Sequence, residues 1–186
     1  AIENVRLFKE LEARNKDLGE SLEQQTATAD ILKIISSSLT DTQPVFDAIV
    51  KSGVHLFGGM DMSLRLVKGN RIEVVASTLP SDAGKAYSFP IDGRSTASRS
   101  VLRREVVQTP DLFAEDWIDD SVKQVAESRG IRAVVSAPML RDNHAIGAIV
   151  VTRATRGSFT EKQVALLKPF ADQAVIAIEN VRLFNE

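Results

Sequence analysis

Alternating polar and apolar residues on one expected strand provide the first candidates for ligand binding. Within residues 60–66, Ser63 and Arg65 alternate with Leu64 and Leu66, so the two polar side chains point to the same face of the strand. If the leucines face a layer of helices, Ser63 and Arg65 face the opposite side. A hydroxyl and a guanidinium group on that side could bind a polar small molecule.

Three further residues could belong to the same site. Ser136 lies in a β-branched segment and Thr109 lies at the end of a short expected strand, so both side chains could line the space above Arg65. Trp117 lies in the loop that would cover this space, where an aromatic side chain could close a pocket. Two alternatives stay open: Trp117 plugs its own loop, or the pocket is filled by the domain's own side chains. The expected site comprises Ser63, Arg65, Thr109, Trp117 and Ser136.

A basic group surrounds a short helix that Ser95 could cap. Free N–H groups at the N-terminus of a helix can bind a phosphate or carboxylate. A solvated basic face, with arginines near the helix C-terminus, is the simpler explanation and the one we favour. The group consists of Arg94, Arg99, Arg103 and Arg104.

An acidic loop offers oxygen ligands without the spacing of a metal site. Its carboxylates could bind a hard cation, but they lack the alternating ligands of a calcium loop. Acidic residues before a helix also interact favourably with its dipole. We therefore predict no metal site in the group Asp111, Glu115, Asp116, Asp119 and Asp120.

Residues that usually perform covalent or metal-based catalysis are scarce. The sequence has no cysteine, which excludes disulfides, thiolate nucleophiles, cysteine-ligated zinc and thioether-linked tetrapyrroles. The two histidines, His55 and His144, are far apart in the sequence, and we expect them on a helix and in a turn. No nucleophile–base pair emerges, so we predict that the chain is not an enzyme.

Charge and hydropathy argue against two further classes of partner. The 186 residues include 23 basic and 25 acidic side chains, a net charge of −2. Nucleic-acid-binding domains usually carry a basic surplus, so we expect no nucleic-acid partner. No stretch approaches the roughly 18 consecutive apolar residues of a membrane span, and residues 1–10 lack a secretory pattern. We expect a cytoplasmic protein without membrane contact.

An octapeptide occurs twice, near the two ends of the sequence. Residues 1–8 and residues 177–184 both read AIENVRLF. We favour a tandem array, in which the last helix of one domain leads into the next domain. A duplicated helical patch, or one domain flanked by two copies of a linker, is the alternative.

Residues 1–40 predict a helical linker that pairs with its own copy. Apolar residues recur with heptad spacing over residues 8–39, with leucine at most d positions. A leucine stripe on an isolated helix must pack on something, and asparagine at an a position favours a parallel homodimer. A helix packed on its own domain is the alternative. The expected dimer interface comprises Leu11, Asn15, Leu18 and Leu22.

The rest of the chain alternates between helical and strand patterns. A helix is expected after Pro44, and a capping box at Thr160 and Gln163 begins a long closing helix. Helices at the ends and strands at the centre indicate an α+β fold: an antiparallel sheet with long terminal helices on one face and short helices on the other. The short helices are expected after Ser95 and around residues 122–126, and the strands at 60–66, 71–77, 87–91, 105–109, 131–140 and 145–155.

This order of elements resembles the GAF domain family, in particular the serial GAF modules of bacterial sensor histidine kinases and nucleotide cyclases. Four segments carry the resemblance: PVFDAIVKSGVHLFG at 44–58, FPIDGRSTASRSVLRREVVQT at 89–109, VVSAPMLRDNHAIGAIVVT at 134–152, and FTEKQVALLKPFADQAVIAIENVRLF at 159–184. The resemblance implies that residues 41–186 form a GAF domain after the linker at residues 1–40.

The resemblance also implies a function. A GAF domain has a small-molecule pocket between its sheet and its short helices. It would be a non-catalytic sensory module of a larger cytoplasmic signalling protein, with a sensor histidine kinase as the favoured parent. It would bind a ligand or relay signals through its terminal helices to a second copy and to neighbouring domains. A ligand-free dimerisation spacer, or part of a nucleotide cyclase, is the alternative.

The sequence departs from the specialised members of that family. Without cysteine it can hold no covalent bilin, and it lacks the catalytic cysteines of free methionine-sulfoxide reductases. The Asn-Lys-Phe-Asp signature of members that bind cyclic nucleotides is missing, and neither His55 nor His144 is well placed to ligate haem. We therefore predict no cofactor, and the sequence does not name a ligand.

Overall fold

The computed structural model describes residues 2–37, 42–58, 60–79 and 87–184, which form five helices and six strands. In chain order the elements are α1 (Ile2–Ser37), α2 (Gln43–Leu56), β1 (Asp61–Lys68), β2 (Arg71–Ser77), β3 (Ser88–Pro90), α3 (Thr96–Arg103), β4 (Val107–Thr109), α4 (Asp120–Ser128), β5 (Ala133–Arg141), β6 (His144–Arg153) and α5 (Glu161–Phe184).

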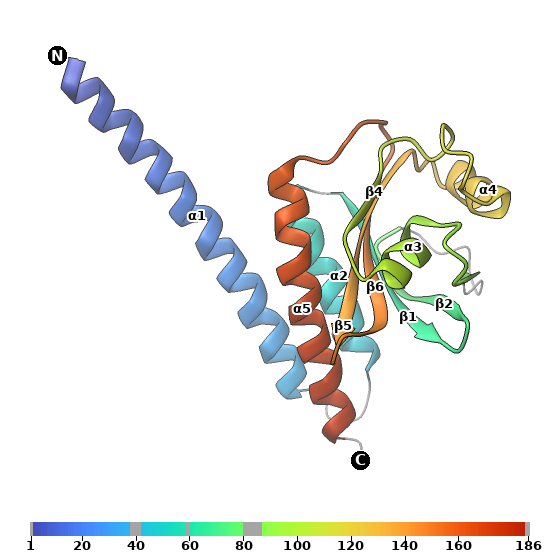
Figure 1. Ribbon diagram of the computed structural model, residues 1–186. Coiled ribbons are helices and arrows are strands. Elements are labelled where there is room, and N and C mark those ends of the chain that lie inside the picture. Colours follow the sequence, from blue (N-terminus) through green and yellow to red (C-terminus); the bar gives the residue numbers. More distant parts are fainter. Residues whose placement is uncertain (1, 38–41, 59, 80–86, 185–186) are drawn as a thin grey trace.

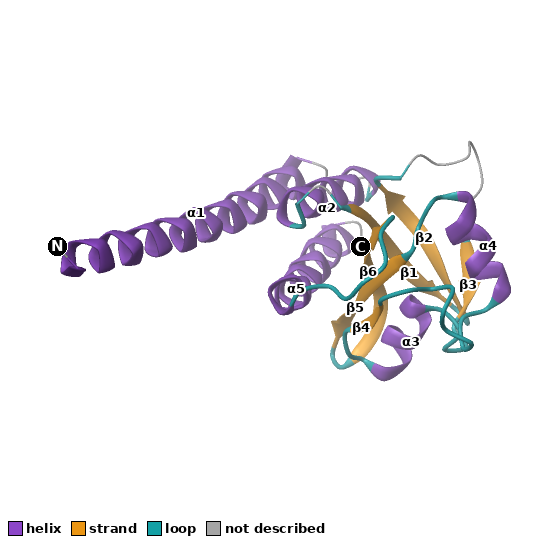
Figure 2. Ribbon diagram, turned by 90° about the horizontal axis from the view of Figure 1, so that it is seen from above, coloured by secondary structure: helices purple, strands orange, loops and turns teal. Residues whose placement is uncertain are grey.

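The strands form one antiparallel sheet in the order β3-β2-β1-β6-β5-β4 (Figure 2). Its central strands are β1 and β6, and Arg65 of β1 lies opposite Ala148 of β6. A two-residue turn joins β5 to β6. Asp142 and Asn143 in this turn have φ values of 47° and 63°, which a tight hairpin requires and which Asp and Asn adopt readily.

Different helices cover the two faces of the sheet (Figure 1). On one face, α2 and α5 pack against the larger apolar core, which includes Leu64 and Ile149. On the other face, α3 and α4 cover a second apolar cluster, which includes Val134 and Val150. Successive residues of a strand point to opposite faces, so β6 supplies side chains to both layers. This is the α+β architecture that the sequence predicted.

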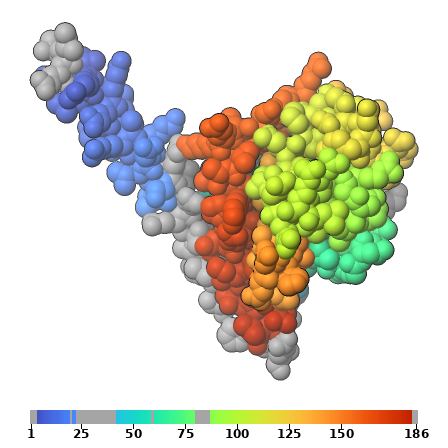
Figure 3. Space-filling view, in the orientation of Figure 1, coloured from blue at the N-terminus to red at the C-terminus, as the bar shows by residue number. Residues whose placement is uncertain are grey.

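The long helix α1 lies on the same side of the sheet as α2 and α5, in an outer layer (Figure 1). Its backbone contacts α2 and α5, whereas its N-terminal part stands clear of the rest of the protein (Figure 3). The helices in contact with strands on this side are α2 and α5. None of the helices described is long and apolar enough to cross a membrane.

The observed elements follow the predicted order with small shifts at their ends. β4 keeps only Val107–Thr109 of the strand expected at 105–109, and α5 continues through Pro169. Most of the loop expected after β2 and the heptad position Leu39 lie outside the described residues, as do the side chains of residues 23–37.

Candidate ligand-binding cavity

A cavity of about 60 Å³ lies between the sheet and the helices α3 and α4. Strands β1, β2 and β6 form its floor, while the N-terminus of α3 and one side of α4 form its walls. A space of this size holds a few water-sized groups. Its polar lining comprises Ser63, Arg65, Ser77, Tyr87, Ser95, Thr96, Arg129 and Thr152.

Arg65 is the central charged group of this cavity. Its Nε–H donates to the hydroxyl of Ser63 over 3.4 Å, and its guanidinium carbon lies 5.6 Å from the centre of the Phe89 ring. No carboxylate within the described residues pairs with this half-buried side chain. Since a guanidinium group has five N–H donors, most of the donors of Arg65 are available to a ligand.

Arg129, the residue after α4, brings a second positive charge to the same wall. Its guanidinium carbon lies 4.4 Å from the centre of the Tyr87 ring. Burial, and to a smaller extent the charge of Arg129, lowers the pKa of Arg65 to about 10. Both effects disfavour the charged form of Arg65, which is nevertheless the form present at neutral pH. An anion in the cavity would offset both the burial of Arg65 and the repulsion from Arg129.

The N-terminus of α3 adds backbone donors to the wall. Ser95 caps the helix: its hydroxyl accepts from the Ser98 N–H at 3.1 Å, and the Ser98 hydroxyl accepts from the Ser95 N–H at 3.2 Å. The N–H groups of Thr96 and Ala97 belong to the first turn and have no acceptor within the helix. Both residues line the cavity, where these N–H groups favour negative charge.

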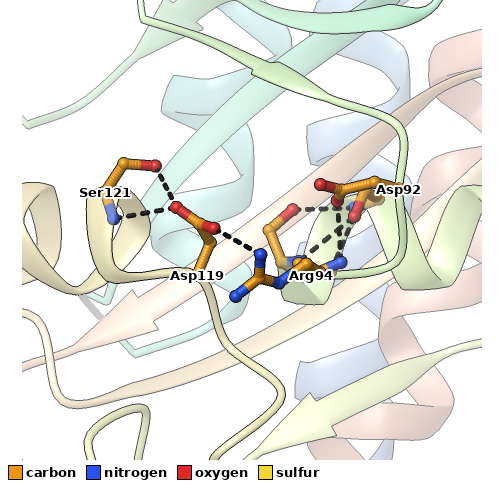
Figure 4. A network of polar contacts seen from close by, with 6 residues as sticks. Asp92, Arg94, Asp119 and Ser121 are labelled. Atoms are coloured by element: carbon orange, nitrogen blue, oxygen red, sulfur yellow. Dashed lines mark hydrogen bonds and ion pairs between the residues drawn. The ribbon is translucent and has the colours of Figure 1, made fainter.

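A polar network holds α3 and α4 together (Figure 4). Arg94 Nη1 lies 3.0 Å from Asp119 Oδ2, and the Asp119 N–H donates to the Arg94 carbonyl oxygen at 2.9 Å. Asp119 also caps α4 by accepting from the hydroxyl and the N–H of Ser121. Both hydrogen bonds lower the pKa of Asp119, and the bond from the Ser121 hydroxyl has the larger effect. The network thereby fixes the start of α4 beside the start of α3.

The structure places two of the five predicted site residues in the cavity wall. Ser63 and Arg65 project from the same face of β1, as their alternation with the leucines predicted. Thr109 lies one layer behind the wall, where its Oγ1 is 2.8 Å from the Oγ1 of Thr96. Thr109 can therefore orient Thr96 but does not line the cavity.

Ser136 and Trp117 do not line the cavity either. Ser136 is fully buried, and its carbonyl oxygen accepts from the hydroxyl of Ser100 at 3.2 Å. The Trp117 Nε1–H donates to Glu115 at 2.6 Å, and the guanidinium carbon of Arg99 lies 3.3 Å from the Trp117 ring centre. Trp117 thus fastens its own loop to α3 instead of covering the cavity.

The charged groups noted in the sequence make contacts within the fold. The contacts of Arg94 and Arg99 are described above. In the same basic group, Arg103 lies 3.5 Å from Glu105. In the acidic loop, Asp111 lies 3.3 Å from Arg132. Within the described part of the chain, no three His, Asp or Glu residues are grouped so that they could hold a metal ion. Arg103 and Asp111 thus each have an oppositely charged partner within the domain.

Sequence analysis missed several polar residues of the wall. Thr152 could have been found, because it shares the alternation of β6 with Val150, which also lines the cavity. Tyr87 and Arg129 carry no such pattern. Arg129 meets Tyr87 at the cavity because of where the end of α4 lies over the sheet, and local spacing does not specify that position.

Comparison with known proteins identifies the family. The family model for the GAF domain matches residues 41–178. The chain belongs to the GAF domain family. The match spans the whole sheet and the cavity, and leaves out all of α1 and the last residues of α5. No curated protein matches the chain by sequence.

Solved structures share the fold of this GAF domain at low sequence identity. The GAF domain of an Acinetobacter phosphoenolpyruvate-protein phosphotransferase has a TM-score of 0.68 at 15% identity, over 86% of this chain and 95% of that one. Free methionine-R-sulfoxide reductase from Neisseria meningitidis, solved with its substrate, scores 0.67 at 16% identity, over 89% and 93%. A domain assigned to a two-component sensor histidine kinase of Sinorhizobium meliloti scores 0.62 at 15% identity, over 77% and 94%. These likenesses establish the fold.

Without a ligand, Arg65 should destabilise the GAF domain. We predict that Arg65→Met, which removes the charge and keeps an unbranched side chain, raises the free energy of unfolding by about 1 kcal/mol, because a half-buried charge that no described carboxylate neutralises is unfavourable. Urea denaturation at neutral pH measures this change. Arg103→Met, at an exposed position on α3, is the matched control and should change stability by less than about 0.5 kcal/mol. A less stable Arg65→Met variant would contradict the prediction.

Proposed function

We propose that this GAF domain is a non-catalytic regulatory module that binds a small anion in the cavity beneath α3 and α4. The observation that carries the proposal is the position of Arg65: it lines the cavity beside Ser63, and within the described residues no carboxylate pairs with it. A carboxylate or phosphate group is the partner that the planar guanidinium fork recognises, through two parallel N–H···O bonds.

The rest of the wall suits a short molecule with one anionic end. The volume of about 60 Å³ leaves room for only a few non-hydrogen atoms. The hydroxyl groups of Ser63 and Thr152 and the first-turn N–H groups of α3 offer further donors, whereas Phe89 and Val150 offer apolar surface. We infer that the ligand is a short-chain carboxylate or an inorganic oxyanion.

A surface groove beside the cavity gives such a ligand a route of access. The groove and the cavity share Val74, Ser77, Leu79, Tyr87 and Arg129. The contact between Arg129 and Tyr87 therefore stands at the boundary between groove and cavity. A small movement of the end of α4 would admit the ligand.

The central strands can carry the effect of binding to the long helices. On β1, Ser63 and Arg65 alternate with Met62 and Leu64, whose side chains lie in the core with α2 and α5. Arg141 of β5 forms an ion pair of 2.7 Å with Glu179 of α5. A shift of β1 around an anion would change the packing of both helices.

The parent protein that we propose is a sensor histidine kinase, with a nucleotide cyclase as the alternative. Structural neighbours include a domain assigned to such a kinase and residues 122–287 of a methyl-accepting chemotaxis protein, at 15% and 23% identity. Both support a signalling context for this fold. In that context the terminal helices connect the module to its neighbours in the chain.

Anion binding should depend on Arg65 and not on the basic face of α3. We predict that titration calorimetry with phosphate, acetate and other two- to four-carbon carboxylates detects at least one ligand. Arg65→Ala should weaken binding at least about tenfold, since a charge-assisted bidentate contact contributes at least 1.4 kcal/mol. Arg103→Ala should bind like the unmodified protein. An equal or larger loss at Arg103 would place the site on the basic helix, and no binding by any anion would favour a ligand-free spacer.

A dimerisation spacer is the second candidate, and the exposed stripe of α1 favours it. Phe8, Leu11, Leu18 and Leu22 are all more than half exposed, with Leu18 at 67%. They follow the a and d positions of the heptad pattern, with Asn15 between them. Such a stripe gains stability when it packs against its own copy. Dimerisation and ligand binding are compatible, because α1 and the cavity lie on opposite sides of the sheet (Figure 1).

The protein should form a parallel homodimer through α1. We predict dimers in sedimentation equilibrium at tens of micromolar, and monomers when Leu18→Asp and Leu22→Asp are combined, because charges would then lie in the apolar seam. Leu18→Asp alone should weaken the dimer more than Ala13→Asp, which adds the same charge on the opposite face of the helix. A protein that is monomeric throughout, or a dimer that survives the double substitution, would contradict this interface.

A further inference from the structure

The repeated octapeptide AIENVRLF occupies two different environments. In its second copy, at the end of α5, Ala177 and Val181 are buried, with exposed fractions of 0% and 1%. In the first copy, at the start of α1, Val5 is the counterpart of Val181 and is 57% exposed. The same valine of the octapeptide is therefore buried at one end of the protein and exposed at the other.

Another face of the helix is exposed in both copies. Leu7 and Leu183 are counterparts, and both are exposed, at 53% and 62%. The face that carries Val181 belongs to the core that α5 forms with α2 and the sheet, and Glu179 on α5 pairs with Arg141 of β5. The first copy thus retains a face that in the second copy fits a GAF sheet and its α2.

We propose that residues 1–8 are also the last turns of the closing helix of a preceding GAF domain in the same polypeptide. In that arrangement Val5 belongs to the core of the preceding domain, as Val181 belongs to the larger apolar core here. Helix α5 of one domain then continues without a break as α1 of the next. This inference does not depend on a ligand in the cavity.

The directions of the helices allow such a repeat. The two copies of the octapeptide lie at opposite ends of the molecule, and α1 and α5 run in the same general direction (Figure 1). A chain leaving α5 can therefore enter a further α1 without reversing. The octapeptide contains neither glycine nor proline, so nothing in it ends a helix. The joined helix would have about 50 residues and a length of roughly 80 Å.

Thiol reactivity in the natural full-length polypeptide tests this proposal, because the chain described here has no cysteine of its own. Val5→Cys should react with a thiol reagent at least 30-fold more slowly than Leu7→Cys, and about as slowly as the buried reference Val181→Cys. In residues 1–186 alone, Val5→Cys should react within about threefold of Leu7→Cys. Any other cysteine in the full-length polypeptide is first replaced by serine.

A dimer of α1 could also protect Val5, so the measurement is repeated with Leu18→Asp and Leu22→Asp in the full-length polypeptide. Protection that persists in this background supports a preceding domain. Protection lost with the helix pairing overturns the proposal. Equal rates for Val5→Cys and Leu7→Cys in the full-length polypeptide overturn it as well, as does a polypeptide with no GAF domain before residue 1.

Discussion

Arg65, on a central strand of the sheet, pairs with no carboxylate of the described residues, and this charge constrains how one face of the domain is built. Apolar side chains alone cannot close a face that contains Arg65, because burying an uncompensated charge is costly. This face instead combines hydroxyl groups, the N-terminus of α3 and a small cavity. The opposite face has no such constraint and packs as an apolar core beneath α2 and α5.

In the proposed function, stability and recognition are divided between the two faces. Leu64 and Ile149 are fully buried on the face beneath α2 and α5, where the Phe57 and Phe170 rings also meet edge to face. On the other face, α3 and α4 cover the second apolar cluster, and polar contacts such as the pair of Arg94 with Asp119 join the starts of the two helices. Contacts of that kind can open at less cost than a packed core. The wall of the cavity can therefore respond to a ligand while the core keeps the sheet intact.

The order of the helices and strands, and the position of Ser63 and Arg65 in the site, could be predicted from local sequence patterns. The alternation within β1 was sufficient to place Ser63 and Arg65 together, because strand parity is a local property. Trp117 is an aromatic residue in a loop that could cover the cavity, but its ring packs against Arg99 of α3 instead. Arg129 reaches the cavity only because α4 ends above the sheet. Contacts between distant elements such as these depend on helix placement, which sequence spacing does not encode.

Anomalous diffraction from crystals soaked in selenate tests the central claim most directly, since selenate is a small oxyanion whose position can be located independently of phases from the protein. The account predicts a selenium peak inside the cavity, with an oxygen within about 3 Å of the guanidinium nitrogens of Arg65. Peaks confined to the exposed arginines of α3, with none in the cavity, would contradict it.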